Sequence, residues 1–140
     1  MNTSRVALIY GIVFLVIGVA GFIPGITAPH THPEMTAESG LGLLFGLFAV
    51  NLLHNIVHVL FGIWGIFAAR SLGGARAYFK SVAIIYAILG VMGLIPGLRT
   101  TFGLIPLYGH DVWLHFVLAG VAAYFGFARR EETAAATAVR

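Results

Sequence analysis

The sequence is organised around a polar stretch inside an apolar segment, Asn51-Leu52-Leu53-His54-Asn55-Ile56-Val57-His58, which continues to Gly62 and Gly65. On an ideal helix, which advances about 100° per residue, the Asn and His residues and the two glycines fall within an arc of about 100°. Polar groups are costly in lipid and tend to face the interior of a bundle. We therefore expect this face to point at another helix.

The composition is typical of an integral membrane protein. The chain has 140 residues, of which 59% are hydrophobic and 9% charged, and its mean hydropathy is +0.95. The net charge of +3 rests on only eight basic residues, and no nucleic-acid-binding motif is present. Cysteine is absent, which excludes disulfides and thiolate chemistry. We expect the lipid bilayer as a partner and no nucleic acid, and the sequence leaves open a membrane-protein partner or a homo-oligomer.

Apolar segments long enough to cross the hydrocarbon core, which takes about 18 residues, lie at about residues 6–23, 41–69, 77–95 and 111–128. They predict an all-α, polytopic membrane protein with one four-helix transmembrane domain over residues 1–130 and a polar cytoplasmic tail over residues 131–140. The second segment, about 43 Å long as one helix, must tilt or project beyond the bilayer.

Basic residues indicate which side of the membrane each loop occupies. One side carries Arg5, Arg70, Arg76, Lys80, Arg129, Arg130 and Arg140, and the other carries only Arg99. By the positive-inside rule, both termini are cytoplasmic. The loop between the first two spans is then external, and for its His30, His32 and Glu34 a solvated loop is favoured over a metal relay.

The two halves of the chain resemble each other. Val6-Ala7-Leu8-Ile9-Tyr10 matches Val82-Ala83-Ile84-Ile85-Tyr86, and Gly21-Phe22-Ile23-Pro24-Gly25 matches Gly93-Leu94-Ile95-Pro96-Gly97. Each half holds two crossings, which predicts an antiparallel bundle of two tandem two-helix repeats about a pseudo-twofold axis along the membrane normal. Tyr10 and Tyr86, which are equivalent by the repeat, are expected in an interfacial aromatic belt.

The fourth apolar segment carries a polar face like that of the second. The alignment of the halves pairs His58 with His115 and His54 with Asp111, and each segment has the i, i+4 spacing that lets two side chains grip one ion. Counting from the cytoplasmic Arg residues puts all four side chains in the outer half of the bilayer. The predicted ligands of a divalent metal are therefore His54, His58, Asp111 and His115.

The chemical type of these four ligands limits which metal ions are candidates. Imidazole and carboxylate ligands without sulfur favour Zn²⁺, Fe²⁺ or Mn²⁺. Asn51 and Asn55 would not bind the metal themselves but would orient the imidazoles by hydrogen bonds. A bound metal is compatible with hydrolysis, redox chemistry or sensing, so the sequence leaves open whether the protein is an enzyme.

Two other interpretations of the polar residues stay open. Buried His, Asp and Asn side chains can hydrogen-bond only to lock helices together, at about 0.6 to 2 kcal/mol per bond, which predicts a non-catalytic structural or accessory membrane protein. One His from each polar face could instead ligate a b-type haem in an electron carrier. Small residues that would leave room for the porphyrin are Gly62, Gly65, Ala119 and Ala122.

The motifs together resemble a known family. They are Gly21-Phe22-Ile23-Pro24-Gly25, the Asn-x-x-His-Asn-x-x-His of residues 51–58, and Pro106 followed by Asp111, Trp113, Leu114 and His115. In these elements the chain is similar to bacterial membrane proteins catalogued as domain of unknown function 4383. The resemblance implies a four-helix, multi-pass protein of the bacterial plasma membrane, and it supplies no activity.

Overall fold

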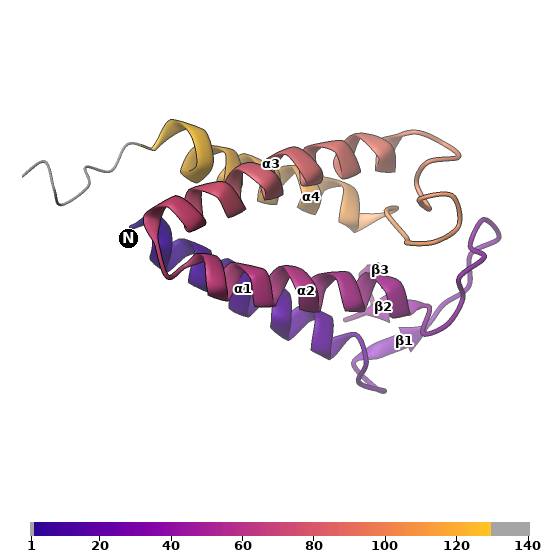
Figure 1. The fold of residues 1–140 in the computed structure, drawn as a ribbon. Helices are drawn as coiled ribbons and strands as arrows, with labels where there is room; N and C mark the ends of the chain where they lie inside the picture. The colour runs from indigo at the N-terminus through magenta and orange to yellow at the C-terminus, as the bar shows by residue number, and fades with distance from the viewer. Residues whose placement is uncertain (1, 130–140) are drawn as a thin grey trace, which may run out of the picture.

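The computed structural model describes residues 2–129 (Figure 1). Its elements are α1 (Thr3–Ala20), β1 (Thr27–Pro29), β2 (Gly42–Leu44), β3 (Phe48–Val50), α2 (Leu52–Ala68), α3 (Leu72–Leu94), α4 (His110–Ala123) and a π-helical turn, η1 (Tyr124–Ala128). The tail predicted for residues 131–140 lies outside the described part of the chain.

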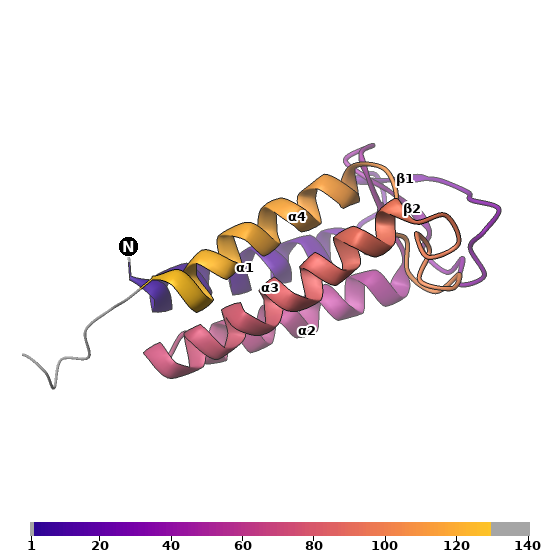
Figure 2. The same ribbon diagram turned by 90° about the horizontal axis from the view of Figure 1, so that it is seen from above.

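The helices lie lengthwise beside one another in two pairs. α1 packs against α2 and α3 packs against α4, whereas the contact between α1 and α4 is limited and includes a hydrogen bond that the Tyr10 hydroxyl donates to the Leu118 carbonyl oxygen. Figures 1 and 2 show the strands and the long loops gathered at one end, where α2 and α4 begin, while the N-terminus lies at the opposite end. We call the first of these the strand end.

The described residues contain three helical stretches that are long and apolar enough to cross a membrane: α1, α3, and α4 together with η1. α2 is shorter, with 17 residues, and is also apolar. Large apolar side chains such as Ile12, Val16 and Ile88 are exposed on the helices. Such apolar surfaces are suited to lipid rather than water. The length and composition of the helices indicate a membrane protein.

The single helix predicted for residues 41–69 is wrong over its first part, so the described fold is mostly helical with a small sheet rather than all-α. β2 and β3 form an antiparallel hairpin in which Leu44 pairs with Phe48, and β1 adds a third strand. The hairpin turns at Phe45 and Gly46, whose φ angles of 54° and 70° are left-handed. A helix cannot continue through such residues. The hydropathy of this segment shows an apolar run, but an apolar run of this length is compatible with a strand as well as with a helix.

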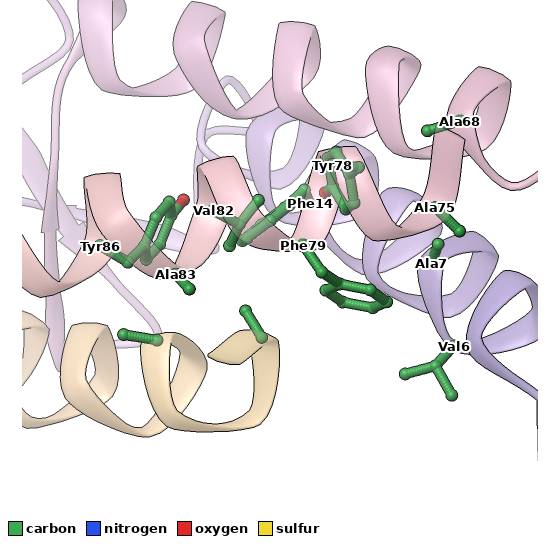
Figure 3. Close-up of a cluster of buried hydrophobic side chains, with 12 residues drawn as sticks. Val6, Ala7, Phe14, Ala68, Ala75, Tyr78, Phe79, Val82, Ala83 and Tyr86 are labelled. Carbon is green, nitrogen blue, oxygen red and sulfur yellow. The ribbon is translucent and has the colours of Figure 1, made fainter. Parts of the chain in front are cut away.

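The core lies between the two helix pairs and is filled largely from α3. Tyr78, Phe79, Val82 and Tyr86 are buried there, and Figure 3 shows them projecting from α3 toward the neighbouring helices. Phe14 of α1 meets the Tyr86 ring at 5.5 Å between centroids. These aromatic contacts join the two helix pairs at mid-length.

Candidate functional site

Asn51 ties the start of α2 to both long loops at the strand end. Its Oδ1 accepts a hydrogen bond from the His54 backbone N–H at 2.9 Å, which caps α2. Its Nδ2 donates to the carbonyl oxygens of Ala37 and Leu104 at 2.9 and 2.7 Å. Because the side chain is fully buried, these bonds satisfy it without water. It acts as a structural junction.

His54 and His58 are neighbours on the buried face of α2, as the i, i+4 spacing predicts. Their ring centroids are 4.1 Å apart. Asn55 is almost fully buried, and its Oδ1 lies 3.4 Å from Nδ1 of His54, which makes the amide a hydrogen-bond partner of this imidazole. An added Cβ on Gly21, the residue that caps the C-terminal end of α1, would collide with the Asn55 side chain, so the close approach of the two depends on glycine here.

Asp111 and His115 lie in the first turns of α4, and both are buried. The Asp111 Oδ2 accepts a hydrogen bond from the Ala49 backbone N–H of β3 at 3.1 Å. Nδ1 of His115 lies 2.6 Å from the backbone carbonyl of Asp111, so it donates within its own helix. Asp111 therefore connects α4 to the sheet by a hydrogen bond. His115 uses one ring nitrogen for a hydrogen bond within α4.

Tyr86 of α3 connects the two polar faces, a role that the sequence interpretation missed. Its hydroxyl lies 3.3 Å from Nε2 of His58, and its ring stacks on His115 with centroids 4.9 Å apart. Only 3% of the residue is exposed, so the expected membrane-interface position is wrong for it. The helical spacing of Tyr86 from Phe79, Val82 and Gly90 was the signal that could have marked it as a core residue.

The predicted metal ligands are thus brought near one another but not into a shared coordination geometry. Within residues 2–129, no group of three or more His, Asp or Glu side chains is arranged to hold a metal ion. Shared coordination needs donor atoms about 2 Å from one point. Oδ2 of Asp111 and Nδ1 of His115 instead bond to backbone groups. The geometry leaves the metal prediction without support.

The geometry around Tyr86 gives no support to the haem interpretation either. Two axial histidines must face each other across the porphyrin plane. His58 and His115 both contact the same Tyr86 ring, which occupies the space between them. The cavity beside these three side chains measures only about 80 Å³.

A much larger cavity lies on the other side of the His54–His58 pair, between α1 and the first turns of α4. Its volume is about 420 Å³. His54, His58 and Asp111 line one part of it, and the remaining lining is apolar or aromatic: Ile9, Tyr10, Val13, Phe14, Ile17, Leu44, Phe48, Val50, Leu114 and Leu118. The cavity has the size of a small-molecule site.

The loops at the strand end are held together by an ion pair. Arg99 donates to both carboxylate oxygens of Glu34, at 2.6 and 3.0 Å. These hydrogen bonds hold the pKa of Glu34 below its usual value and raise that of Arg99. The His32 ring stacks on Tyr108 at 4.2 Å, and burial raises the pKa of Tyr108. The loop predicted to be solvated therefore packs on its neighbour.

Fold, hydropathy and site together define a helical membrane protein with a buried polar cluster and an adjoining apolar cavity. A family model described as Domain of unknown function (DUF4383) matches residues 4–128, so the chain belongs to this family, as its motifs predicted. No curated protein and no solved structure matches the chain.

Proposed function

We propose that the protein is a non-catalytic, multi-pass membrane protein whose Asn, His and Asp cluster fixes the helix pairs and the layer of strands and loops that covers one end of them. The observation that carries this proposal is the Asp111 carboxylate, the most costly group of the cluster to bury, whose Oδ2 is bonded to the backbone of β3. Asn51 likewise bonds to the backbone of both loops.

The helices are proposed to form an antiparallel transmembrane bundle of two tandem repeats. Gly18 approaches Val59 of α2, and Gly90 approaches Phe116 of α4. Gly90 follows Gly18 by 72 residues, the offset between the matched Pro-Gly turns, and Phe116 follows Val59 by 57, the offset between His58 and His115. Equivalent positions thus make equivalent contacts in the two pairs. The turn glycines Gly25 and Gly97 also share left-handed φ angles of 91° and 86°.

The strand end is proposed to lie outside a bacterial plasma membrane, with both termini in the cytoplasm. Arg70, Arg76 and Lys80 lie at or near the start of α3, far from the strands, while Arg99 lies in the loop before α4. This asymmetry follows the positive-inside rule. The cluster then occupies the outer half of the bilayer, with the sheet and loops between it and water.

The test separates a structural carboxylate from a metal ligand by two substitutions at one position. Asp111→Asn keeps an oxygen that accepts the Ala49 N–H bond, so we expect a melting temperature close to that of the unaltered protein. Asp111→Leu leaves this buried donor unpaired, which costs about 1–3 kcal/mol. Thermal unfolding in detergent measures both. An Asp111→Leu variant as stable as the unaltered protein would contradict the proposal.

Elemental analysis of protein purified without chelator, together with an absorption spectrum, tests the two remaining interpretations directly. We expect neither a stoichiometric metal nor a haem absorption band. One zinc, iron or manganese per chain that is lost in Asp111→Asn would restore the metal site and overturn the structural proposal. A haem band lost in His115→Leu would establish the electron carrier.

A further inference from the structure

The turn between β2 and β3 carries apolar side chains on a backbone that does not suit them. Phe45 has a left-handed φ of 54°, a conformation that is unfavourable for residues with a Cβ and that asparagine or glycine usually adopts in turns. The residue is nevertheless 58% exposed, and Leu47 is 51% exposed. Contacts within the described chain therefore do not account for these two side chains, which indicates a partner outside it.

The backbone of this turn does not need water. The Phe45 N–H donates to the carbonyl oxygen of Ile26 at 2.9 Å, and the N–H groups of Gly46 and Leu47 donate to the carbonyl oxygens of Leu43 and Leu44, both at 3.1 Å. A segment in lipid must pair its backbone donors within the protein, because the hydrocarbon offers no hydrogen-bond partner. The N–H groups of the turn meet this condition.

The turn also lies at the level of the helix ends. Leu44 and Phe48, which flank it, line the cavity between α1 and α4, and Figure 1 shows the strands beside the ends of the helices. The ring of Phe48 lies 6.4 Å from that of Trp113, which is 51% exposed in the first turn of α4. An exposed tryptophan at the end of an apolar helix is typical of the membrane interface. The turn is thus close to the depth at which lipid begins.

The chemistry of the surroundings favours lipid over a protein partner. Residues 39–53 contain no Asp, Glu, Lys, Arg or His. Ile26, which accepts the Phe45 bond, follows the end of α1, where Phe22 and Ile23 are 48% and 42% exposed. The turn therefore continues the apolar surface of α1. Interfaces between proteins usually have a polar rim, which this segment does not supply.

We propose that the turn between β2 and β3 is inserted into the bilayer, with the side chains of Phe45 and Leu47 in contact with acyl chains of the leaflet at the strand end. The inference rests on the transmembrane placement of the helices proposed above. It adds a lipid-binding hairpin to that placement, so that part of the sheet lies in the membrane rather than in water.

Spin labels test this directly, because the natural chain has no cysteine to replace. The full chain in nanodiscs carries one nitroxide at a time, at Phe45→Cys or Leu47→Cys. Val16→Cys, at a 58% exposed position of α1, is the lipid control, and Glu38→Cys, in an exposed part of the first long loop, is the water control. Collisions of the nitroxide with molecular oxygen report lipid, and collisions with a water-soluble nickel chelate report water.

The nickel chelate is depleted from hydrocarbon about tenfold or more, because polar groups are unfavourable there without hydrogen bonds. We therefore expect the ratio of oxygen to nickel collisions at Phe45→Cys and Leu47→Cys to be about tenfold above that at Glu38→Cys and similar to that at Val16→Cys. Leu47→Cys keeps the test valid if the loss of Phe45 alters the turn.

A second measurement keeps an aromatic side chain in the turn. Phe45→Trp is made in a chain that also carries Trp64→Phe and Trp113→Phe, so that the new residue is the only fluorophore of its kind. We expect phosphatidylcholine with brominated acyl chains to quench its fluorescence and aqueous iodide to leave it unchanged. Glu38→Trp in the same background should show the opposite pattern.

Nickel collisions at Phe45→Cys and Leu47→Cys as frequent as at Glu38→Cys would overturn the proposal, because the turn would then lie in water. Protection of both labels from oxygen as well as from nickel would also overturn it, because a second copy or another protein would then cover the turn. Frequent nickel collisions at Val16→Cys would instead contradict the transmembrane placement of α1, on which the inference rests.

Discussion

At the scale of single residues, Asn51 is the side chain on which the largest number of separate segments depends. It caps α2 and bonds to Ala37 and Leu104 in the two long loops. Asn51→Ala removes three hydrogen bonds and leaves two carbonyl oxygens and one N–H group without that partner. We expect the free energy of unfolding to fall by about 2–4 kcal/mol, measured by thermal or denaturant unfolding in detergent.

Asn2 offers a matched control for this prediction. It is also an N-cap, and its Oδ1 accepts a bond from the Arg5 backbone N–H at 2.9 Å, but this residue is exposed. Asn2→Ala should therefore cost about 1 kcal/mol or less. If the two substitutions destabilise the protein equally, Asn51 acts only as a cap and does not join the loops.

Glu34 gives the strand end a predictable dependence on pH. Its pKa in the folded protein lies below the usual 4.5 because Arg99 donates hydrogen bonds to the carboxylate. The stabilisation is thus fully present above pH 4.5 and is lost as the pH falls through the lowered pKa. We expect Glu34→Gln to have a slightly lower melting temperature than the unaltered protein at pH 7, with the difference vanishing in acid.

The same Glu34 comparison has a clear contrary outcome. The pair is partly exposed and is screened by salt, so the effect must be small and must shrink at high ionic strength. A difference in melting temperature that persists unchanged in strong acid would mean that Glu34 stabilises the loop through packing rather than through its charge.

At the scale of elements, close helix contacts in both pairs depend on glycine. An added Cβ on Gly18 would lie 2.8 Å from backbone atoms of Asn55 and Val59, which cannot move aside. On Gly90 it would lie 3.0 Å from the Phe116 ring, a side chain that can shift. We therefore expect Gly18→Ala to destabilise the protein by about 1–3 kcal/mol, as overpacking does, and Gly90→Ala by less.

Gly120 of α4 is the control for these contacts, because nothing lies within 4 Å of a Cβ added there. Alanine is the better helix former, so Gly120→Ala should stabilise the protein by up to about 1 kcal/mol. Melting temperatures of the three variants measure the series. A Gly18→Ala variant as stable as Gly120→Ala would contradict the close contact between α1 and α2.

Elements also mark where prediction from sequence succeeded and where it failed. The face of α2 that carries His54, Asn55 and His58 was predicted from the 3.6-residue period, because residues on one face of a helix recur in the sequence with that period. The strands before Asn51 were not predicted, because a short apolar run has no period that distinguishes it from a helix. Tyr86 was missed because tyrosine in an apolar helix is typical of a membrane interface as well as of a core.

At the scale of the whole molecule, the proposed orientation can be tested because the natural chain has no cysteine. Glu38 lies in an exposed part of the first long loop, and Gly73 is exposed near the start of α3. In intact cells, a membrane-impermeant maleimide should label Glu38→Cys and leave Gly73→Cys unlabelled until lysis. The reverse pattern would invert the proposed topology, and labelling of both would contradict a membrane barrier between them.

The membrane class, the family and the residues of the polar cluster could be predicted from the sequence alone, because hydropathy, charge asymmetry and helical period are local properties of the chain. The contacts that those residues make come only from the packing of the helices and strands. Whether Asp111 and His115 meet a metal or the backbone depends on distances between segments far apart in sequence. Packing placed the Asp111 carboxylate on β3 and Tyr86 between the two histidines, and it left a cavity between α1 and α4.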